Sequence, residues 1–228
     1  MAATPAFLFD LDGTLVDTVY QHVLAWWEAL ANEGIELAVW RVHRRIGMSG
    51  GLFVEALLRE TERPVTDAAI ERLQRAHAEL YKANAGQVRP LPGAEALLEH
   101  LTRLGVPWAV ATSGQRDVAE ATLRRLGVRA GVPVVTRDEV EHAKPDPDLF
   151  LAAAAKLGAD VQAAVVVGDS IWDLLAARRA KALGVGLLAG GYGREELERA
   201  GAYRVYEDPA DLLAHLGEVG IRSPRDDG

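Results

Sequence analysis

The chain alternates short apolar runs with longer amphipathic stretches along most of its length. We expect the apolar runs to form buried parallel strands, because such strands are covered on both faces and carry few polar residues. They occupy residues 6–11, 107–111, 132–135, 163–167 and 185–188. The stretches with apolar residues at helical spacing are 94–104, 117–126, 148–157 and 171–183. This alternation predicts an α/β fold built on a doubly wound, Rossmann-like parallel sheet.

One region departs from this alternation. Residues 18–88 hold three helical patterns and no convincing strand. We therefore predict a small all-helical cap domain at residues 18–88, inserted after the first strand of a core domain formed by residues 1–17 and 89–221. The helical patterns are at 19–32, 52–60 and 67–83. Two prolines in the segment 89–93 are expected to close the insertion, because proline interrupts a helix.

The C-terminal part of the chain holds one more short element. Asp208 and Pro209 are suited to cap a helix, which we predict to run to about Leu216. Residues 222–228 are polar and show no periodicity, so we predict a disordered tail there.

Composition narrows the functional classes. The 228 residues include no cysteine, which excludes thiolate ligands and cysteine nucleophiles, and the formal net charge is -8. This charge argues against nucleic-acid binding, which needs clustered Lys and Arg. No apolar run approaches the roughly 18 residues that span a bilayer, and residues 1–5 lack signal-peptide features. We expect a cytoplasmic monomer or homodimer that acts on a small molecule.

Polar residues follow the predicted strands at consistent places, and the carboxyl ends of the strands are where doubly wound sheets bind ligands. The residues at these ends are Asp10, Asp12, Thr112, Ser113, Gly114, Asp169 and Asp173, with Lys144 ahead of the helix predicted at 148–157. Converging carboxylates would repel each other unless a divalent cation and a cationic side chain neutralised them. Oxygen-only ligands favour Mg²⁺, which commonly binds a substrate phosphate. The pattern therefore predicts a Mg²⁺ site and a phosphate ester substrate.

These segments resemble, in order, the four motifs of the haloacid dehalogenase superfamily. Residues 10–17 resemble the first motif, Thr112 the second, Lys144 the third and residues 168–173 the fourth. The helical insertion is similar to the cap of the branch that includes phosphoglycolate phosphatase and beta-phosphoglucomutase. The resemblance implies a phosphoric monoester hydrolase that acts on phosphoglycolate or a sugar phosphate through an aspartyl-phosphate.

The resemblance also implies a role for each motif residue. Asp10 would be the nucleophile, and Asp12 would protonate the leaving alcohol and then activate water. The presence of Asp12 favours phosphoryl chemistry, because the dehalogenases of this superfamily lack an aspartate at this second position of the motif. Lys144 would offset charge on the phosphoryl oxygens. The Mg²⁺ ligands would be Asp10, Asp12, Asp169 and Asp173, the last directly or through water, and the phosphate would be held by Thr112, Ser113, Gly114 and Lys144.

Substrate contacts from the insertion are expected from His22, Arg45 and Gly47. A phosphosugar mutase is the main alternative, because Thr18, His22 and Trp26 resemble the hinge threonine, cap histidine and neighbouring tryptophan of beta-phosphoglucomutase. A structural role for His22 and Trp26 in hinge and core is equally compatible with the sequence.

Gly50 weakens the mutase interpretation, because it stands where the mutase carries an arginine that binds a second phosphate. The missing charge could still come from Arg41, Arg44 or Arg45. A third alternative is a non-catalytic binding protein with this fold. The intact charge cluster argues against it, since uncompensated buried carboxylates are costly.

Overall fold

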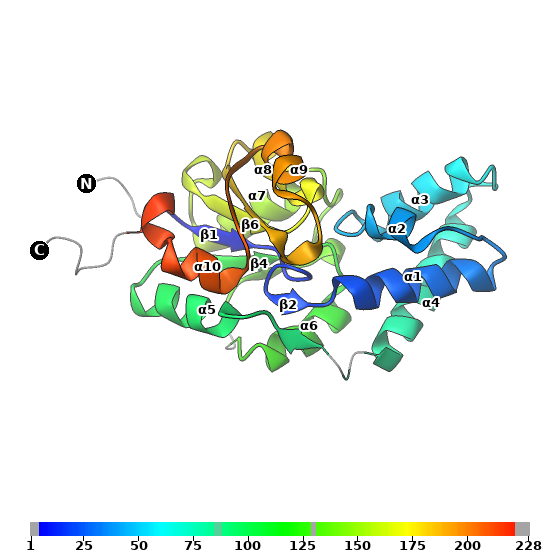
Figure 1. Ribbon diagram of the computed structural model, residues 1–228, viewed down its shortest axis with the longest axis horizontal. Helices are drawn as coiled ribbons and strands as arrows, with labels where there is room; N and C mark the ends of the chain where they lie inside the picture. The colour runs from blue at the N-terminus through cyan, green and yellow to red at the C-terminus, as the bar shows by residue number, and fades with distance from the viewer. Residues whose placement is uncertain (1–4, 85, 87, 129–130, 222–228) are drawn as a thin grey trace, which may run out of the picture.

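The computed structural model describes residues 5–84, 86, 88–128 and 131–221. Its centre is a six-stranded parallel sheet with strand order β5-β4-β1-β6-β7-β8 (Figure 1). The strands are β1 (Phe7–Phe9), β4 (Trp108–Ala111), β5 (Val134–Val135), β6 (Val165–Gly168), β7 (Leu183–Leu187) and β8 (Ala202–Tyr206). The predicted α/β fold with a parallel sheet is confirmed.

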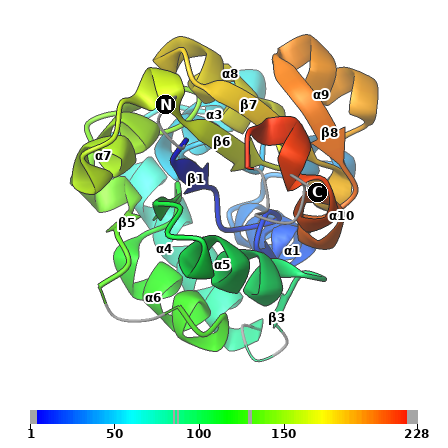
Figure 2. The same ribbon diagram turned by 90° about the vertical axis from the view of Figure 1, so that its left-hand side faces the viewer.

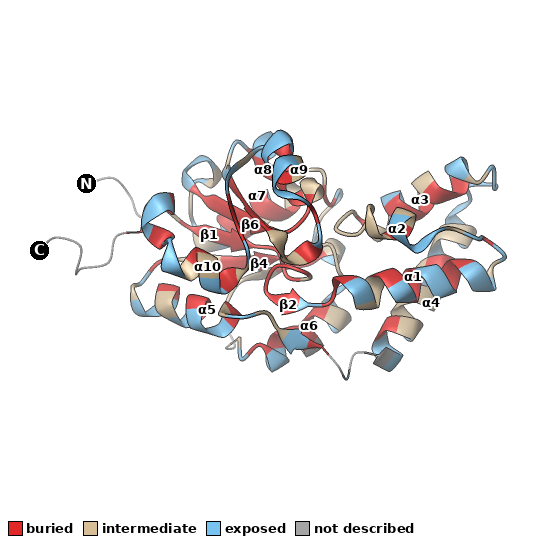
Figure 3. Cartoon of the chain, viewed as in Figure 1, coloured by how far each residue is buried: buried red, intermediate tan, exposed pale blue. Residues whose placement is uncertain are grey.

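Helices cover both faces of this sheet (Figure 2). Side chains alternate along each strand, so Phe7 and Phe9 pack toward one helix layer and Leu8 toward the other. The first layer contains α5 (Ala94–Arg103), α6 (Arg116–Arg125) and α10 (Pro209–Ala214), and the second contains α7 (Asp148–Leu157) and α8 (Ile171–Ala180). Figure 3 shows the buried residues concentrated between these layers.

Smaller elements complete the core. Helix α9 (Arg194–Ala200) packs against β7 and β8. Among the described residues, 3₁₀ turns occur at η2 (Arg137–Glu139), η3 (Val161–Ala163), η4 (Leu188–Gly190) and η5 (Leu216–Val219). No helix in the described part of the chain is long and apolar enough to cross a membrane.

The segment between β2 (Val16–Asp17) and β3 (Arg89–Pro90) is helical and lies at one end of the sheet (Figure 1). It contains α1 (Val19–Asn32), α2 (Val39–His43), α3 (Gly50–Glu60) and α4 (Asp67–Asn84). Strands β2 and β3 pair antiparallel, with Asp17 opposite Arg89, so the chain leaves and re-enters the core at one place. The four helices bury an apolar cluster of their own, which includes Val23, Leu30, Phe53, Leu57 and Leu73.

Several predicted boundaries differ from the structure. Helix α8 ends at Ala180 rather than Leu183, because Lys181 adopts a left-handed conformation with φ of 60°. Strand β7 consequently begins two residues earlier than predicted. Helix α3 begins at Gly50, because the Ser49 side chain accepts the Leu52 N–H and caps the helix.

Apart from the 3₁₀ turns, five of these elements were not predicted from the pattern: β2, β3, α2, α9 and β8. In β8, Tyr203 and Arg204 are exposed, so the strand lacks the continuous apolar run of its neighbours. The predicted C-terminal cap is confirmed, since the Asp208 carboxylate accepts the N–H groups of Ala210 and Asp211. The tail predicted at 222–228 lies outside the described residues.

Candidate active site

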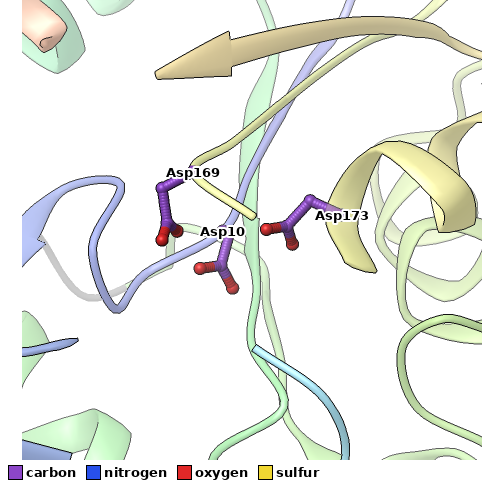
Figure 4. Close-up of side chains that lie close together, drawn as sticks. All are labelled: Asp10, Asp169 and Asp173. Carbon is purple, nitrogen blue, oxygen red and sulfur yellow. The ribbon is translucent and has the colours of Figure 1, made fainter. Parts of the chain in front are cut away.

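Three carboxylates meet at the carboxyl end of the sheet (Figure 4). Asp10 follows β1 and Asp169 follows the adjacent strand β6, while Asp173 lies in the first turn of α8. One oxygen from each lies within 4.8 Å of the others, and all three residues are buried. We call Asp10, Asp169 and Asp173 the acidic cluster.

Lys144 is the cation that faces this cluster. Its Nζ contacts the Asp10 carboxylate and lies 2.7 Å from Asp173 Oδ1. The side chain is fully buried, unlike that of an ordinary surface lysine. Burial alone would lower the pKa of the Lys144 ammonium, but the two carboxylates raise it above its usual value. Lys144 is therefore charged in the folded chain.

The acidic cluster carries more negative charge than Lys144 can offset. Burial raises the pKa of Asp10 to about 7, against the attraction of Lys144. Burial, followed by repulsion from Asp173 and Asp10, raises the pKa of Asp169 well above its usual value, although Thr14 Oγ1 donates a 2.9 Å hydrogen bond to it. When all three are ionised, three carboxylates and one ammonium leave a buried excess of negative charge. An oxygen-only ligand set with this excess fits a hard divalent cation.

Glycines allow the chain to pass close to Asp169. A Cβ atom on Gly190 would lie 1.8 Å from Asp169 Oδ2, and one on Gly13 would lie 2.5 Å from the same atom. Gly13 also has a φ of 83°, which other residues rarely adopt. Larger side chains at either position would displace this carboxylate.

Asp12 lies outside the acidic cluster, and its carboxylate has different partners. Its Oδ1 accepts a 2.8 Å hydrogen bond from Thr18 Oγ1 and lies 3.3 Å from His22 Nε2. Burial acts to raise the pKa of Asp12, but His22 and Thr18 hold it below its usual value. Asp10 and Asp12 are thus neighbours whose environments shift their pKa values in opposite directions.

The segment after β4 lies beside these aspartates. Thr112 is buried, and its Oγ1 accepts a 3.0 Å hydrogen bond from the Gly114 N–H. Ser113 Oγ donates a 3.3 Å hydrogen bond to the Gly47 carbonyl, which belongs to the loop before α3. The Ser49 N–H in the same loop donates to the Lys144 carbonyl. The insertion therefore contacts the core at two residues of the predicted site.

A cavity of about 140 Å³ lies between the core and the helical insertion. Eight of the predicted site residues line it: Asp10, Asp12, His22, Arg45, Gly47, Thr112, Ser113 and Gly114. Lys144, Asp169 and Asp173 do not line it, although Lys144 contacts Asp10, which does. The volume is suited to a small molecule.

The arginines of the insertion are engaged with carboxylates. Arg41 and Arg45 both contact Glu60, and Arg45 Nη1 also donates to the Arg41 carbonyl at 2.8 Å. Arg44 pairs with Glu196 of α9 through both of its terminal nitrogens. Arg45 alone of the three lines the cavity.

A family model described as haloacid dehalogenase-like hydrolase matches residues 4–181. The chain belongs to this hydrolase family. The predicted superfamily is therefore confirmed, and the segments that resemble its four motifs lie together at one end of the sheet.

Relatives of this hydrolase are named for phosphatase activity. It is 36% identical over 166 residues to hexitol phosphatase A of Escherichia coli strain K12, covering 72% of this chain and 74% of that protein. It is 34% identical over 192 residues to phosphoglycolate phosphatase of Agrobacterium fabrum, covering 82% of each chain. These relatives confirm the prediction that the chain is a phosphoric monoester hydrolase.

A solved structure of a hydrolase from Pseudomonas syringae is similar along almost the whole chain. It shares 56% sequence identity with a TM-score of 0.93, covering 95% of this chain and 100% of that one. The fold is therefore shared with an experimentally determined hydrolase.

Sequence reasoning did not single out several residues at the site. His77, Tyr81 and Arg137 line the cavity of this hydrolase, and Thr14 holds Asp169. His77 lies on the face of α4 that also carries the buried Leu73 and Tyr81. A polar residue on an otherwise apolar helical face was the available signal.

Proposed function

We propose that the chain is a Mg²⁺-dependent phosphatase that hydrolyses a small phosphate monoester of the phosphoglycolate or sugar phosphate class. The observation that carries this proposal is the position of Asp10. Its carboxylate belongs to the acidic cluster, contacts Lys144 and lines the cavity next to Asp12 and Thr112. The two curated relatives named for sugar-alcohol and phosphoglycolate phosphatases support the substrate class.

Asp10 would act as nucleophile. Its carboxylate oxygen forms a bond to phosphorus while the bond from phosphorus to the alcohol oxygen breaks, which leaves an aspartyl-phosphate. Asp12 donates a proton to the leaving alcohol and then accepts one from the water that attacks phosphorus. This second step releases inorganic phosphate and regenerates Asp10. The separate hydrogen-bond partners of Asp12 support its separate role.

The remaining groups would stabilise charge. Asp10, Asp169 and Asp173 would hold Mg²⁺, and Asp12 stays a predicted ligand. Bound Mg²⁺ would supply positive charge opposite the phosphoryl oxygens. Lys144 holds Asp10 and Asp173 in place and adds a second positive charge beside the nucleophile. Thr112 and the backbone N–H groups near it would bind the phosphoryl oxygens.

Residues 18–88 would act as a cap that opens to admit substrate and closes to exclude water. Three features support this role: the attachment at β2 and β3, the separate apolar cluster of the four helices, and the cavity lined from both sides. His22, Arg45 and Gly47 would contact substrate from the cap.

The mutase alternative needs a site in the cap for a second phosphate. Gly50 lines the cavity at the place expected for a phosphate-binding arginine, and Arg41, Arg44 and Arg45 already contact carboxylates. Net hydrolysis is therefore favoured over transfer to a second sugar oxygen.

Release of inorganic phosphate from a panel of phosphate monoesters tests the proposal. We expect release that requires Mg²⁺, stops with chelator and is abolished by Asp10→Asn. Asp146→Asn is the matched control, because Asp146 pairs with Arg179 away from the cavity and should release phosphate at the wild-type rate. Release that persists in Asp10→Asn would contradict the proposal, and so would an isomerised phosphosugar formed without net release of phosphate.

A further inference from the structure

Two histidines link Asp12 to the far wall of the cavity. His22 Nε2 lies 3.3 Å from Asp12 Oδ1, and His22 Nδ1 lies 3.1 Å from His77 Nε2. Both imidazoles line the cavity. Asp12, His22 and His77 therefore form a continuous chain of hydrogen bonds from the core into the cap.

Aromatic neighbours fix the planes of these two rings. The His22 ring stacks on Tyr81 with a centroid separation of 3.9 Å, and the His77 ring stacks on Trp26 at 4.1 Å. Both pairs are close to parallel, with interplanar angles of 2° and 11°. The directions in which the ring nitrogens point are therefore set before a substrate binds.

One ring nitrogen in this series of hydrogen-bonded side chains is left for a ligand. Within the described residues, His77 Nδ1 has no hydrogen-bond partner, while His77 Nε2 is occupied by His22. Burial, with a smaller contribution from His22, lowers the pKa of His77 well below its usual value, so this ring is neutral near pH 7. A neutral imidazole has one donor nitrogen and one acceptor nitrogen.

The protonation state of His22 decides whether His77 Nδ1 is a hydrogen-bond donor or an acceptor. If His22 carries one proton, on Nε2 toward Asp12, its Nδ1 accepts from His77 Nε2–H and His77 Nδ1 is an acceptor. If His22 carries two protons, His77 Nε2 accepts and His77 Nδ1–H donates. A hydroxyl group can pair with Nδ1 in both states, whereas a carboxylate can pair only with the donor form.

We propose that His77 is a specificity-determining residue that hydrogen-bonds a hydroxyl group of the substrate through Nδ1. The preferred substrates are then phosphate esters of polyhydroxy alcohols rather than phosphoglycolate. This inference rests on the proposed phosphatase activity. Trp26, which stacks on His77 and also lines the cavity, adds apolar surface against which the carbon chain of such an alcohol packs.

Substrate analogues and two variants of His77 test this role. The probe is the hexose or hexitol phosphate with the highest kcat/KM, together with its monodeoxy analogues. For the wild type, removal of one particular hydroxyl should lower kcat/KM about tenfold, which corresponds to one lost hydrogen bond. In His77→Gln, whose amide can replace Nε2 but not Nδ1, the ester and that deoxy analogue should have nearly equal kcat/KM.

His77→Asn is the complementary variant, because its amide lies where Nδ1 was and cannot reach His22. It should keep the deoxy penalty although its activity falls. His100→Gln, a histidine of α5 outside the cavity, should keep the wild-type penalty. Circular dichroism confirms that each variant is folded.

Each outcome decides the inference. A deoxy penalty that persists in His77→Gln contradicts it, as does a wild type that shows no penalty for any hydroxyl, even if His77→Gln does not fold. A wild type that hydrolyses phosphoglycolate in preference to every hydroxylated ester also contradicts it, while leaving the proposed phosphatase intact. A wild type that releases phosphate from no ester instead overturns the proposed function.

Discussion

His43 Nε2 lies 2.9 Å from the carbonyl oxygen of Gly190, which joins the helical insertion to the loop that covers Asp169. The same contact region includes a parallel stack of His43 on Tyr20 and a hydrogen bond from Tyr192 Oη to the Arg44 carbonyl. The helical insertion is therefore tied to the loop that lies against Asp169, and this contact would hold the proposed cap closed.

Loss of the His43 hydrogen bond should weaken closure of the proposed cap. In His43→Phe the aromatic stack on Tyr20 is retained and the bond to Gly190 is lost. We expect kcat/KM for the best ester to fall about fivefold, in line with about 1 kcal/mol for one hydrogen bond. Arg199→Ala removes only an exposed ion pair with Glu195 and should leave kcat/KM unchanged. Equal kinetics for His43→Phe and the wild type would show that this contact does not hold the cap.

Asp169→Asn should separate metal binding from folding. Because the pKa of Asp169 is raised by burial and like charges, its ionised form destabilises the metal-free fold near pH 7. The amide should therefore raise Tm in chelator. Mg²⁺ should raise Tm of the wild type but not of the variant, since binding to the native state stabilises it. Thermal unfolding with and without Mg²⁺ measures both effects, and an equal Mg²⁺ shift in the two proteins would exclude Asp169 as a ligand.

Lys144→Met should be strongly destabilising. It leaves the buried Asp10 and Asp173 carboxylates without their cation, and removing one partner of a buried ion pair costs about 3–5 kcal/mol. Urea unfolding measures the change. Lys156→Met removes a partly exposed pair with Glu139 and should change the free energy of unfolding by no more than about 1 kcal/mol. A small effect at Lys144 would mean that its charge is not needed in the folded state.

His77 should make stability depend on pH. Its pKa is lowered in the folded state, so below its ordinary value of 6.5 the unfolded chain binds a proton that the folded chain does not. Its contribution to stability is present above pH 6.5 and is lost as pH falls, by up to about 1.4 kcal/mol per pH unit. The difference in unfolding free energy between wild type and His77→Gln, measured from pH 7.5 to 5.5, should therefore shrink as pH falls. A constant difference would show that His77 titrates normally.

Much of the core could be predicted from the sequence, because parallel strands leave continuous apolar runs and place polar residues directly after them. Asp10, Thr112 and Asp169 were identified in this way. The contacts of the helical insertion could not be predicted, because they join segments far apart in the chain. His77 meets His22 across 55 positions, and Arg44 meets Glu196 across 152. Such pairs depend on how helices pack, which periodicity within one helix does not specify.

The partners of the arginines in the helical insertion were another feature that could not be predicted from the sequence. Sequence alone left Arg41, Arg44 and Arg45 available for substrate, since a run of arginines carries no record of its partners. Glu60 and Glu196, which lie outside that run, contact all three. Pairing with distant acids is therefore a property of these arginines that local spacing could not predict.

The covalent state of Asp10 during turnover tests the central claim most directly. Rapid quenching of the wild type with its best ester and Mg²⁺, followed by mass spectrometry of the peptide that contains Asp10, should reveal one phosphoryl group on that residue at early times. Asp10→Asn should show none. Phosphate release by the wild type without any phosphorylated Asp10, or with the phosphoryl group on another residue, would contradict the account.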